Sequence, residues 1–255
     1  MKATAIGLGL LLASYVTWAE PLLIASSDYS PHTGEHLPEG GALTAIMQAA
    51  FDKMEQPVEI HYMPFARAMQ ASRLGQYAAV LGVKHTDERE QAFYFPEPIY
   101  QTAIVFFKRA DSHYHFDSYL DLVHQGVRYG SVLGYSHPDG LLETRIRHYQ
   151  VSSEEQLFVL LRAGRVDLMA GDKLNGIYLL HHEFPEFLPY INWVEPPIEQ
   201  QPLYLLFSRQ HPQGEALSQA FSEAIMQLKE SGELAQIKQR LLPDARSLQS
   251  APKPQ

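Results

Sequence analysis

The chain has 255 residues, of which 45% are hydrophobic and 19% charged, so it suits one large or two small folded domains and lacks the polar bias of a disordered protein. Asp and Glu number 29 against 20 Lys and Arg, a net charge of −9 without a basic cluster, which makes nucleic acid and anionic membranes poor candidate partners. The absence of cysteine excludes disulfides, thiolate metal sites, catalytic cysteines and a lipidated N-terminal cysteine.

The first 19 residues have the pattern of a secretory signal peptide. A positive start at Met1-Lys2 precedes an apolar run over 3–13, and Thr17-Trp18-Ala19 places small residues where signal peptidase reads them. A membrane anchor is the alternative, but the run is shorter than the ~18 apolar residues of a spanning helix. We therefore expect cleavage after Ala19 and a soluble, periplasmic protein without a lipid anchor.

The first half of the mature chain alternates between strand and helix patterns. In chain order these predict a strand at 22–25, a helix over 43–51, a strand at 58–62, a helix from Pro64 to near Gly75, and strands at 78–83 and 103–107. Strands that alternate with helices form parallel sheets with helical crossovers.

The same pattern then starts again. It predicts a strand at 127–132, a helix from Pro138 or Asp139 to His148, a helix that begins with the capping box Ser153–Gln156 and ends at Gly164, a strand at 166–170, a helix at 173–182, a strand at 203–207, and two C-terminal helices broken at Gly232. The repeat predicts an α/β protein with two lobes, each a mainly parallel sheet flanked by helices, and a ligand cleft between them.

The repeat also predicts the limits of the two lobes. We expect residues 20–109 and 200–242 to form lobe 1 and residues 110–199 to form lobe 2, with the chain crossing near 108–112 and 196–202. Residues 243–255 are polar and contain proline, so we expect a disordered tail.

Several residues invite a chemical interpretation that their context does not support. The histidines of His113-Tyr-His115 and His181-His182 lack third and fourth ligands at metal-site spacing, so we interpret them as solvated and predict no metal and no cofactor. The segment Gly134-Tyr-Ser136-His-Pro138 lacks the second glycine of a hydrolase nucleophile turn. It reads better as a strand-to-helix turn whose amides and hydroxyl can hold an anion.

Arg89 and Asp172 each have two possible roles. Thr86 can cap a short helix, but capping does not explain Arg89, whose guanidinium could hold a ligand carboxylate or form a surface ion pair. Asp172 follows a strand and is a good N-cap for the next helix. That role leaves open whether its outer oxygen also accepts a ligand ammonium.

Seven short segments match, in order, the pattern of one family of exported proteins. They are Tyr29-Ser-Pro31, Gly41, Pro64-Phe-Ala-Arg67, Thr86-x-x-Arg89 with Phe95-Pro-Glu-Pro98-Ile-Tyr100, Gly130 to Ser136, Ala163-Gly-Arg-Val-Asp167 with Asp172, and Ser231-Gly-Glu-Leu234 to Leu242. With these in register along nearly the whole mature chain, the sequence resembles the amino-acid-type bacterial periplasmic solute-binding proteins (family 3), which include the histidine- and the lysine/arginine/ornithine-binding proteins.

The resemblance implies a type II periplasmic-binding-protein fold and a ligand site. By position, Arg89 would hold the ligand α-carboxylate and Asp172 its α-ammonium, Tyr29 would pack on the ligand side chain, and the turn at Tyr135-Ser136 would add donors. The resemblance also places Phe65, Gly82 and Lys84 at the site.

This sequence departs from the family pattern at four positions. His32 stands where an aromatic is common, Phe65 replaces tryptophan, and Tyr77 replaces an aspartate of the family's Gly-x-x-Asp-Ala segment. Lys84 stands where small hydroxyl residues often line the site. Lys84 would either add a second positive charge that favours an acidic ligand, or point to solvent.

We therefore expect a monomeric binding protein that closes on an amino acid or related carboxylate and presents it to an ABC transporter permease or a membrane sensor. The alternatives are a sensing adaptor without a permease and a dehydratase-like enzyme on the same scaffold. The enzyme would need a cleft carboxylate as general acid or base, for which Glu97 and Glu195 are the candidates. We expect that the protein is not an enzyme.

Overall fold

The computed structural model describes residues 20–114 and 116–243. The expected signal peptide over 1–19, His115 and all but the first residue of the expected tail lie outside these ranges.

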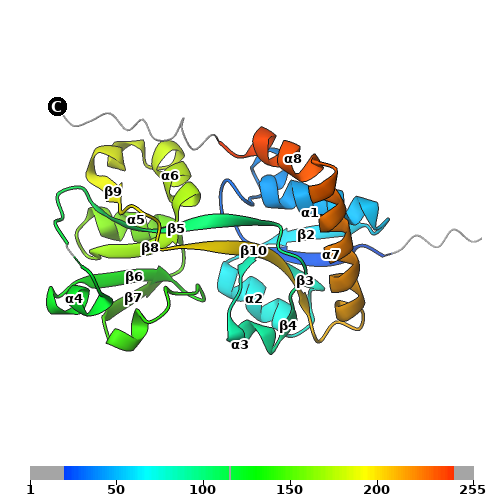
Figure 1. Cartoon of the computed structure of the whole chain (residues 1–255), viewed down its shortest axis with the longest axis horizontal. Coiled ribbons are helices and arrows are strands. Elements are labelled where there is room, and N and C mark those ends of the chain that lie inside the picture. The colour runs from blue at the N-terminus through cyan, green and yellow to red at the C-terminus, as the bar shows by residue number, and fades with distance from the viewer. Residues whose placement is uncertain (1–19, 115, 244–255) are drawn as a thin grey trace, which may run out of the picture.

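The molecule consists of two lobes joined by two long strands (Figure 1). Lobe 1 contains β1 (Leu22–Ser26), the 3₁₀ turn η1 (Pro38–Gly40), α1 (Ala42–Lys53), β2 (Val58–Tyr62), α2 (Phe65–Arg73), β3 (Ala79–Lys84), α3 (Asp87–Glu90), β4 (Phe93–Tyr94), α7 (Gly214–Glu230) and α8 (Glu233–Leu241). Lobe 2 contains α4 (Tyr119–His124), β6 (Arg128–Val132), η2 (Leu142–Thr144), β7 (Arg147–Val151), α5 (Glu154–Arg162), β8 (Leu168–Asp172), α6 (Lys173–His182), η3 (Pro185–Tyr190) and β9 (Ile191–Trp193). The two-lobed α/β architecture expected from the sequence is confirmed.

The strands β5 (Tyr100–Arg109) and β10 (Glu199–Ser208) run through both lobes. Strand β5 pairs antiparallel with β10 over Tyr100–Ile104 and then with β8 over Ile104–Lys108. The chain thus passes between the lobes inside continuous strands, and the sheet order is β2-β1-β3-β10-β5-β8-β6-β7. Each lobe keeps a parallel part, β1 with β2 and β3 in lobe 1, and β6 with β7 and β8 in lobe 2.

The helical spacing of the first lobe buries one face of α1. Its apolar residues Leu43, Ile46, Met47, Ala50 and Phe51 are all fully buried. Phe51 packs against Phe221 of α7 with ring centroids 5.5 Å apart, so the N-terminal and C-terminal helices share one core. None of the helices within the described ranges is long and apolar enough to cross a membrane.

The helix predicted from residue 138 or 139 to 148 is wrong. The chain instead forms the short turn η2 and then the strand β7, which pairs parallel with β6. The buried anchors of this segment, Leu141 and Ile146, are five residues apart, which is not the spacing of one helix face. Between them Arg145 adopts a left-handed φ of 60°, which ends the helical turn. The sequence also did not predict the short elements β4, α4 and β9.

Candidate functional site

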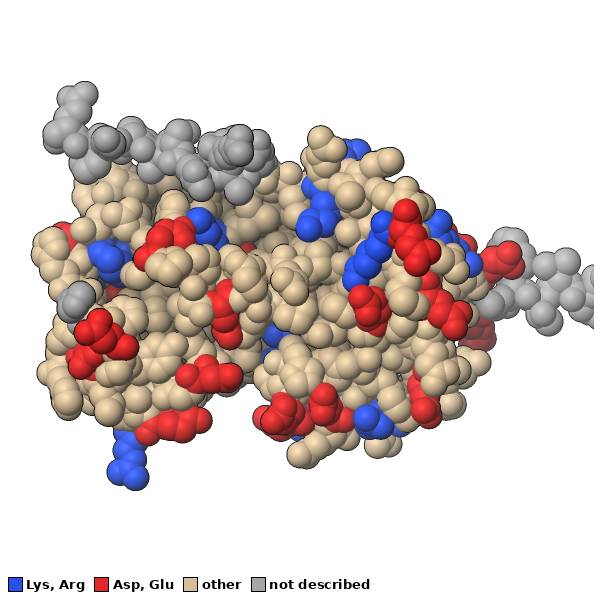
Figure 2. All heavy atoms as spheres, in the orientation of Figure 1, with Lys and Arg blue, Asp and Glu red and all other residues tan. Residues whose placement is uncertain are grey.

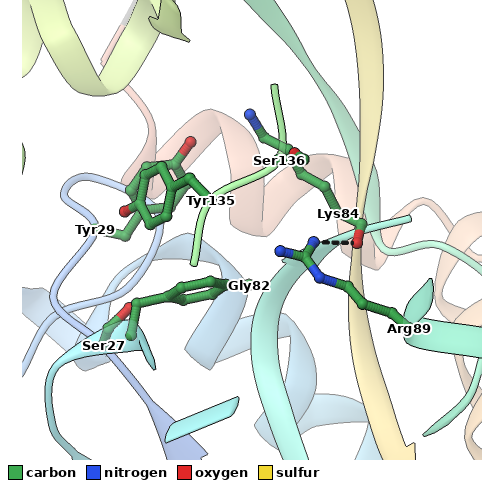
Figure 3. A pocket seen from close by; sticks show the side chains of 8 residues that line it. Ser27, Tyr29, Gly82, Lys84, Arg89, Tyr135 and Ser136 are labelled. Carbon is green, nitrogen blue, oxygen red and sulfur yellow. Dashed lines mark hydrogen bonds between the residues drawn. The ribbon is translucent and has the colours of Figure 1, made fainter. Parts of the chain in front are cut away.

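A cavity lies between the lobes, at the carboxyl ends of β1 and β3 (Figure 3). It is lined by Ser27, Tyr29, Phe65, Gly82, Lys84, Arg89, Tyr135 and Ser136. The empty space at the cavity, counted together with the open solvent at its mouth, is about 320 Å³. Seven of the eight residues that the sequence pointed to thus line one cavity. The eighth, Asp172, does not line it.

The topology explains why these segments meet. Parallel strands β1 and β3 end at the same edge of the sheet, so Ser27 and Tyr29, which follow β1, face the end of β3. Lobe 2 contributes Tyr135 and Ser136 from the turn that follows β6. Ser27 was not predicted, although its place directly after a buried strand was a usable signal.

Gly82 makes a bulge that sets the direction of Lys84. The pairing of β3 with β10 steps from Leu81–Leu205 to Val83–Tyr204, leaving Gly82 as the extra residue, with φ at 82°. Such a backbone angle favours glycine. Because a bulge reverses the alternation of side chains, Val83 packs in the same core cluster as Val80, and Lys84 leaves the strand toward the cavity.

Arg89 is buried at the cavity wall and holds backbone from both lobes. Its Nη1 donates to the carbonyl of Lys84 over 2.6 Å and its Nη2 to the carbonyl of Gly134, in lobe 2, over 2.9 Å. The predicted cap is confirmed, since Thr86 accepts from the Arg89 amide. The surface ion pair considered for Arg89 is wrong, because the residue is only 6% exposed and forms no ion pair within the described residues. Burial lowers the pKa of Arg89 to about 10, so it stays charged at neutral pH.

Lys84 extends along the cavity toward Ser136 (Figure 3). Its carbonyl accepts from Arg89, but its ammonium has no hydrogen-bond or ion-pair partner in residues 20–114 and 116–243. Burial lowers the pKa of Lys84, and the charge of Asp172 opposes this shift.

Three aromatic rings form the apolar part of the cavity. Phe65 and Tyr135 come from different lobes and meet edge to face, with centroids 5.0 Å apart, and Tyr29 lies edge-on to Tyr135 at 6.3 Å. The Arg89 guanidinium lies 5.7 Å from the Phe65 ring centre. Burial raises the pKa of Tyr29 and of Tyr135 well above the ordinary range, so both remain hydroxyl donors.

Asp172 is buried next to the cavity and bonded to protein groups. It caps α6 by accepting from the Asn175 amide over 2.9 Å, which confirms its predicted structural role. It also accepts from the Thr102 hydroxyl, and its Oδ2 lies 3.2 Å from His32 Nε2. Burial alone would raise the pKa of Asp172, but these partners outweigh it and lower the pKa to about 2. Its role toward a ligand ammonium stays a prediction.

Glu154 is a second buried carboxylate beside the site. It accepts from the Tyr135 hydroxyl over 2.5 Å, and burial raises its pKa to about 7. The sequence pattern marked Glu154 only as part of a capping box, which is an exposed role in most helices. Only the packing of lobe 2 shows that it is buried.

The carboxylates considered for an enzyme lie elsewhere. Glu97 pairs with Lys229 over 2.7 Å, and Glu195 pairs with Lys173, which lowers the pKa of Glu195. Neither lines the cavity. In the described ranges, no group of three His, Asp or Glu residues is arranged to hold a metal ion.

Comparison with known proteins gives one family and one fold. The family described as bacterial extracellular solute-binding proteins, family 3, matches residues 26–244. No curated protein sequence matches the chain significantly.

Three solved structures illustrate the fold. A histidine kinase sensor domain with similarity to periplasmic binding proteins has a TM-score of 0.76 at 19% identity, over 88% of this chain and 96% of that one. The GluR0 ligand-binding core from Nostoc punctiforme, in complex with L-glutamate, has a TM-score of 0.71 at 18% identity, over 87% of this chain and 99% of that one. The arginine-, lysine-, histidine-binding protein ArtJ from Geobacillus stearothermophilus has a TM-score of 0.73 at 16% identity, over 91% of this chain and 100% of that one. At these identities the likeness shows the fold, and it confirms the expected two-lobed periplasmic-binding-protein fold.

Proposed function

Because the chain belongs to the bacterial extracellular solute-binding proteins, family 3, we propose that it captures a small polar ligand, an amino acid or related carboxylate, by closing its lobes on the cavity. The observation that carries this proposal is the origin of the cavity wall. Arg89 and Lys84 come from lobe 1, whereas Tyr135 and Ser136 come from lobe 2. A ligand between them bonds to both lobes only when they are closed, so binding favours closure.

The polar groups of the cavity are sufficient for useful affinity. Micromolar binding requires about 8 kcal/mol. Two of the five N–H groups of Arg89 are used by backbone carbonyls, which leaves three for a ligand carboxylate. Charge-assisted bonds of this kind, with burial of the ligand carbons against the aromatic rings, supply that energy after the costs of closure.

We further propose that the bound ligand is presented to an ABC transporter permease by a monomeric, periplasmic protein. The family description as extracellular and the signal-peptide pattern over residues 1–19 support this location. Mass spectrometry of the exported protein should find a mature N-terminus at Glu20. An intact N-terminus in the membrane fraction would contradict export by cleavage.

A sensing role is the second candidate, because a histidine kinase sensor domain is among the similar folds. Deletion of the protein separates the two roles. A transport protein is required for uptake of its ligand at low concentration. A sensing adaptor is required for a response to the ligand but not for its uptake. Glu97 and Glu195 do not line the cavity, so neither supports the dehydratase-like enzyme considered from the sequence.

The binding function is tested by a thermal-shift screen over amino acids, carboxylates and polyamines, followed by calorimetry. We expect a ligand from the first two groups to raise the melting temperature. Arg89→Lys keeps the charge but loses the planar fork, so affinity should fall at least about tenfold. Arg240→Lys, which alters an exposed pair with Glu39, is the matched control and should bind normally. No binding by any compound would contradict the proposal.

A further inference from the structure

The cavity lining has two positively charged side chains and no acidic one. Lys84 and Arg89 are the only charged residues among the eight that line it. Figure 2 shows acidic side chains spread over both lobes on the face in view, with Lys or Arg atoms at the inner end of the notch between the lobes. The molecule as a whole carries a net charge of −9, so the cavity is opposite in sign to the surface around it.

The two cations of the cavity are in different states. Arg89 already donates to two backbone carbonyls, which hold its guanidinium in place. The ammonium of Lys84 has no partner within the described residues. Lys84 is only partly buried, and an anionic group on the ligand would give its unpartnered ammonium a charge-assisted bond, which is stronger than a bond between neutral groups. Lys84 therefore favours a ligand with a second acidic group, in addition to the carboxylate expected at Arg89.

The carboxylates nearest to the cavity already have protein partners, and neither is among the residues that line the cavity. Asp172 is engaged by His32, by the Thr102 hydroxyl and by the Asn175 amide. Glu154 is engaged by the Tyr135 hydroxyl, and its burial favours the neutral acid. An ammonium placed in the cavity would lie beside two cations and find only hydroxyl and carbonyl oxygens.

Resting on the binding function proposed above, we infer that the ligand is a small dicarboxylate without an ammonium group. One carboxylate bonds to the Arg89 guanidinium and the other to the Lys84 ammonium. The carbon chain between them packs against the rings of Tyr29, Phe65 and Tyr135. The ligand hydroxyl donors are Ser27 and Ser136, whose side-chain oxygens have no partner among the described residues.

Matched ligand pairs test this inference at pH 7.5 by calorimetry on the mature protein. Glutarate is compared with L-glutamate and succinate with L-aspartate, since each pair differs only by the ammonium group. The unbranched dicarboxylates from malonate to adipate find the best length, and L-arginine represents a cationic amino acid. We expect at least one dicarboxylate to bind, at least about tenfold more tightly than the amino acid of the same skeleton.

Three variants test the role of Lys84. Lys84→Gln should lower the affinity for the best dicarboxylate at least about tenfold, whereas Lys84→Arg, which keeps the charge, should retain most of it. Lys53→Gln, which removes a lysine paired with Glu233 at the surface of lobe 1, should leave affinity unchanged. Melting temperatures show whether each variant is folded.

The outcomes separate this inference from the function on which it rests. If L-glutamate, L-aspartate or another amino acid binds more tightly than every dicarboxylate, the inference is overturned and the binding function stands. The same holds if folded Lys84→Gln binds the dicarboxylate as tightly as the natural chain. If neither amino acids nor carboxylates bind, the proposed function fails together with the inference.

Discussion

His32 and Asp172 form a buried contact between the lobes, with His32 Nε2 3.2 Å from Asp172 Oδ2 and the two side chains 1% and 0% exposed. His32 belongs to the loop that follows β1 in lobe 1, and Asp172 ends β8 in lobe 2. The other ring nitrogen of His32 lies 2.7 Å from the hydroxyl of Tyr100, which begins the crossing strand β5. The contact therefore ties both lobes to the strand that joins them.

This arrangement predicts a large effect of Asp172→Asn on stability. Asn caps a helix about as well as Asp, so the start of α6 should be retained. The substitution removes the negative charge beside His32 and leaves buried polar groups imperfectly bonded, so the free energy of unfolding should fall by about 2–4 kcal/mol. Urea denaturation at pH 7 measures it. Asp121→Asn, in the exposed capping box of α4, is the control and should change stability much less. Equal effects of the two substitutions would contradict the structural role of Asp172.

The low pKa of Asp172 predicts acid sensitivity with a defined range. Its pKa is about 2 in the folded protein against 3.8 ordinarily, so the ionised carboxylate stabilises the fold above pH 4. That contribution is lost as pH falls from about 4 to 2, and it amounts to about 2 kcal/mol. The stability difference between the natural chain and Asp172→Asn should therefore narrow over this range. A difference that stays constant from pH 5 to pH 2 would contradict the assignment.

The raised pKa of Glu154 predicts the opposite effect, a stability that falls as pH rises. Its pKa of about 7 in the folded protein exceeds the ordinary 4.5, so the folded state holds a proton that the unfolded chain releases. Stability is then fully present below pH 4.5 and is lost as pH rises from 4.5 to 7, by up to about 3 kcal/mol.

Glu154→Gln tests this dependence, because a glutamine oxygen can still accept from Tyr135. The variant should match the natural chain near pH 5 and be more stable at pH 8, as measured by thermal or urea denaturation at both pH values. Glu215→Gln, at an exposed position in the first turn of α7, is the control, and its effect on stability should be the same at both pH values. If Glu154→Gln destabilises equally at both pH values, the carboxyl is needed for packing rather than penalised by its charge.

The sequence predicts the fold where burial follows a regular spacing. Helix α1 and the strands β1 and β3 were predicted because their apolar residues recur at helical or strand intervals. The segment over 138–148 was mispredicted because its order depends on tertiary contacts. The anchors Leu141 and Ile146 fill the core of lobe 2, and β7 exists only because β6 offers an edge to pair with.

The sequence predicts which residues line the candidate site, but it does not predict which charged groups enter the cavity. Motif positions brought Tyr29, Lys84 and Arg89 together, but no pattern distinguishes an ammonium that enters a cavity from one in solvent. That distinction depends on the bulge at Gly82, which redirects the strand. Likewise, His32 and Asp172 are some 140 residues apart in the sequence, and only the fold shows that they meet and that the carboxylate accepts from Thr102 and from the Asn175 amide.

Asn175 predicts a contribution to closure from outside the cavity. Its Nδ2, at the start of α6 in lobe 2, donates to the carbonyl of Ser30 in lobe 1 over 2.7 Å, and the residue is 3% exposed. It does not line the cavity. Because the bond exists only when the lobes are closed, it should favour the state that binds ligand.

Asn175→Ala should therefore weaken binding without touching the ligand. A hydrogen bond of this kind contributes about 1 kcal/mol, which corresponds to about a fivefold loss of affinity in calorimetry. The Asn175 amide still reaches Asp172, and alanine suits a helix, so lobe 2 should keep its stability. Solution scattering of the free variant should give a larger radius of gyration than the free natural chain, and saturating ligand should restore the compact value. Asn192→Ala, at an exposed site in β9, is the control and should alter neither quantity. Unchanged affinity and an unchanged radius of gyration in Asn175→Ala would mean that this bond does not hold the lobes together.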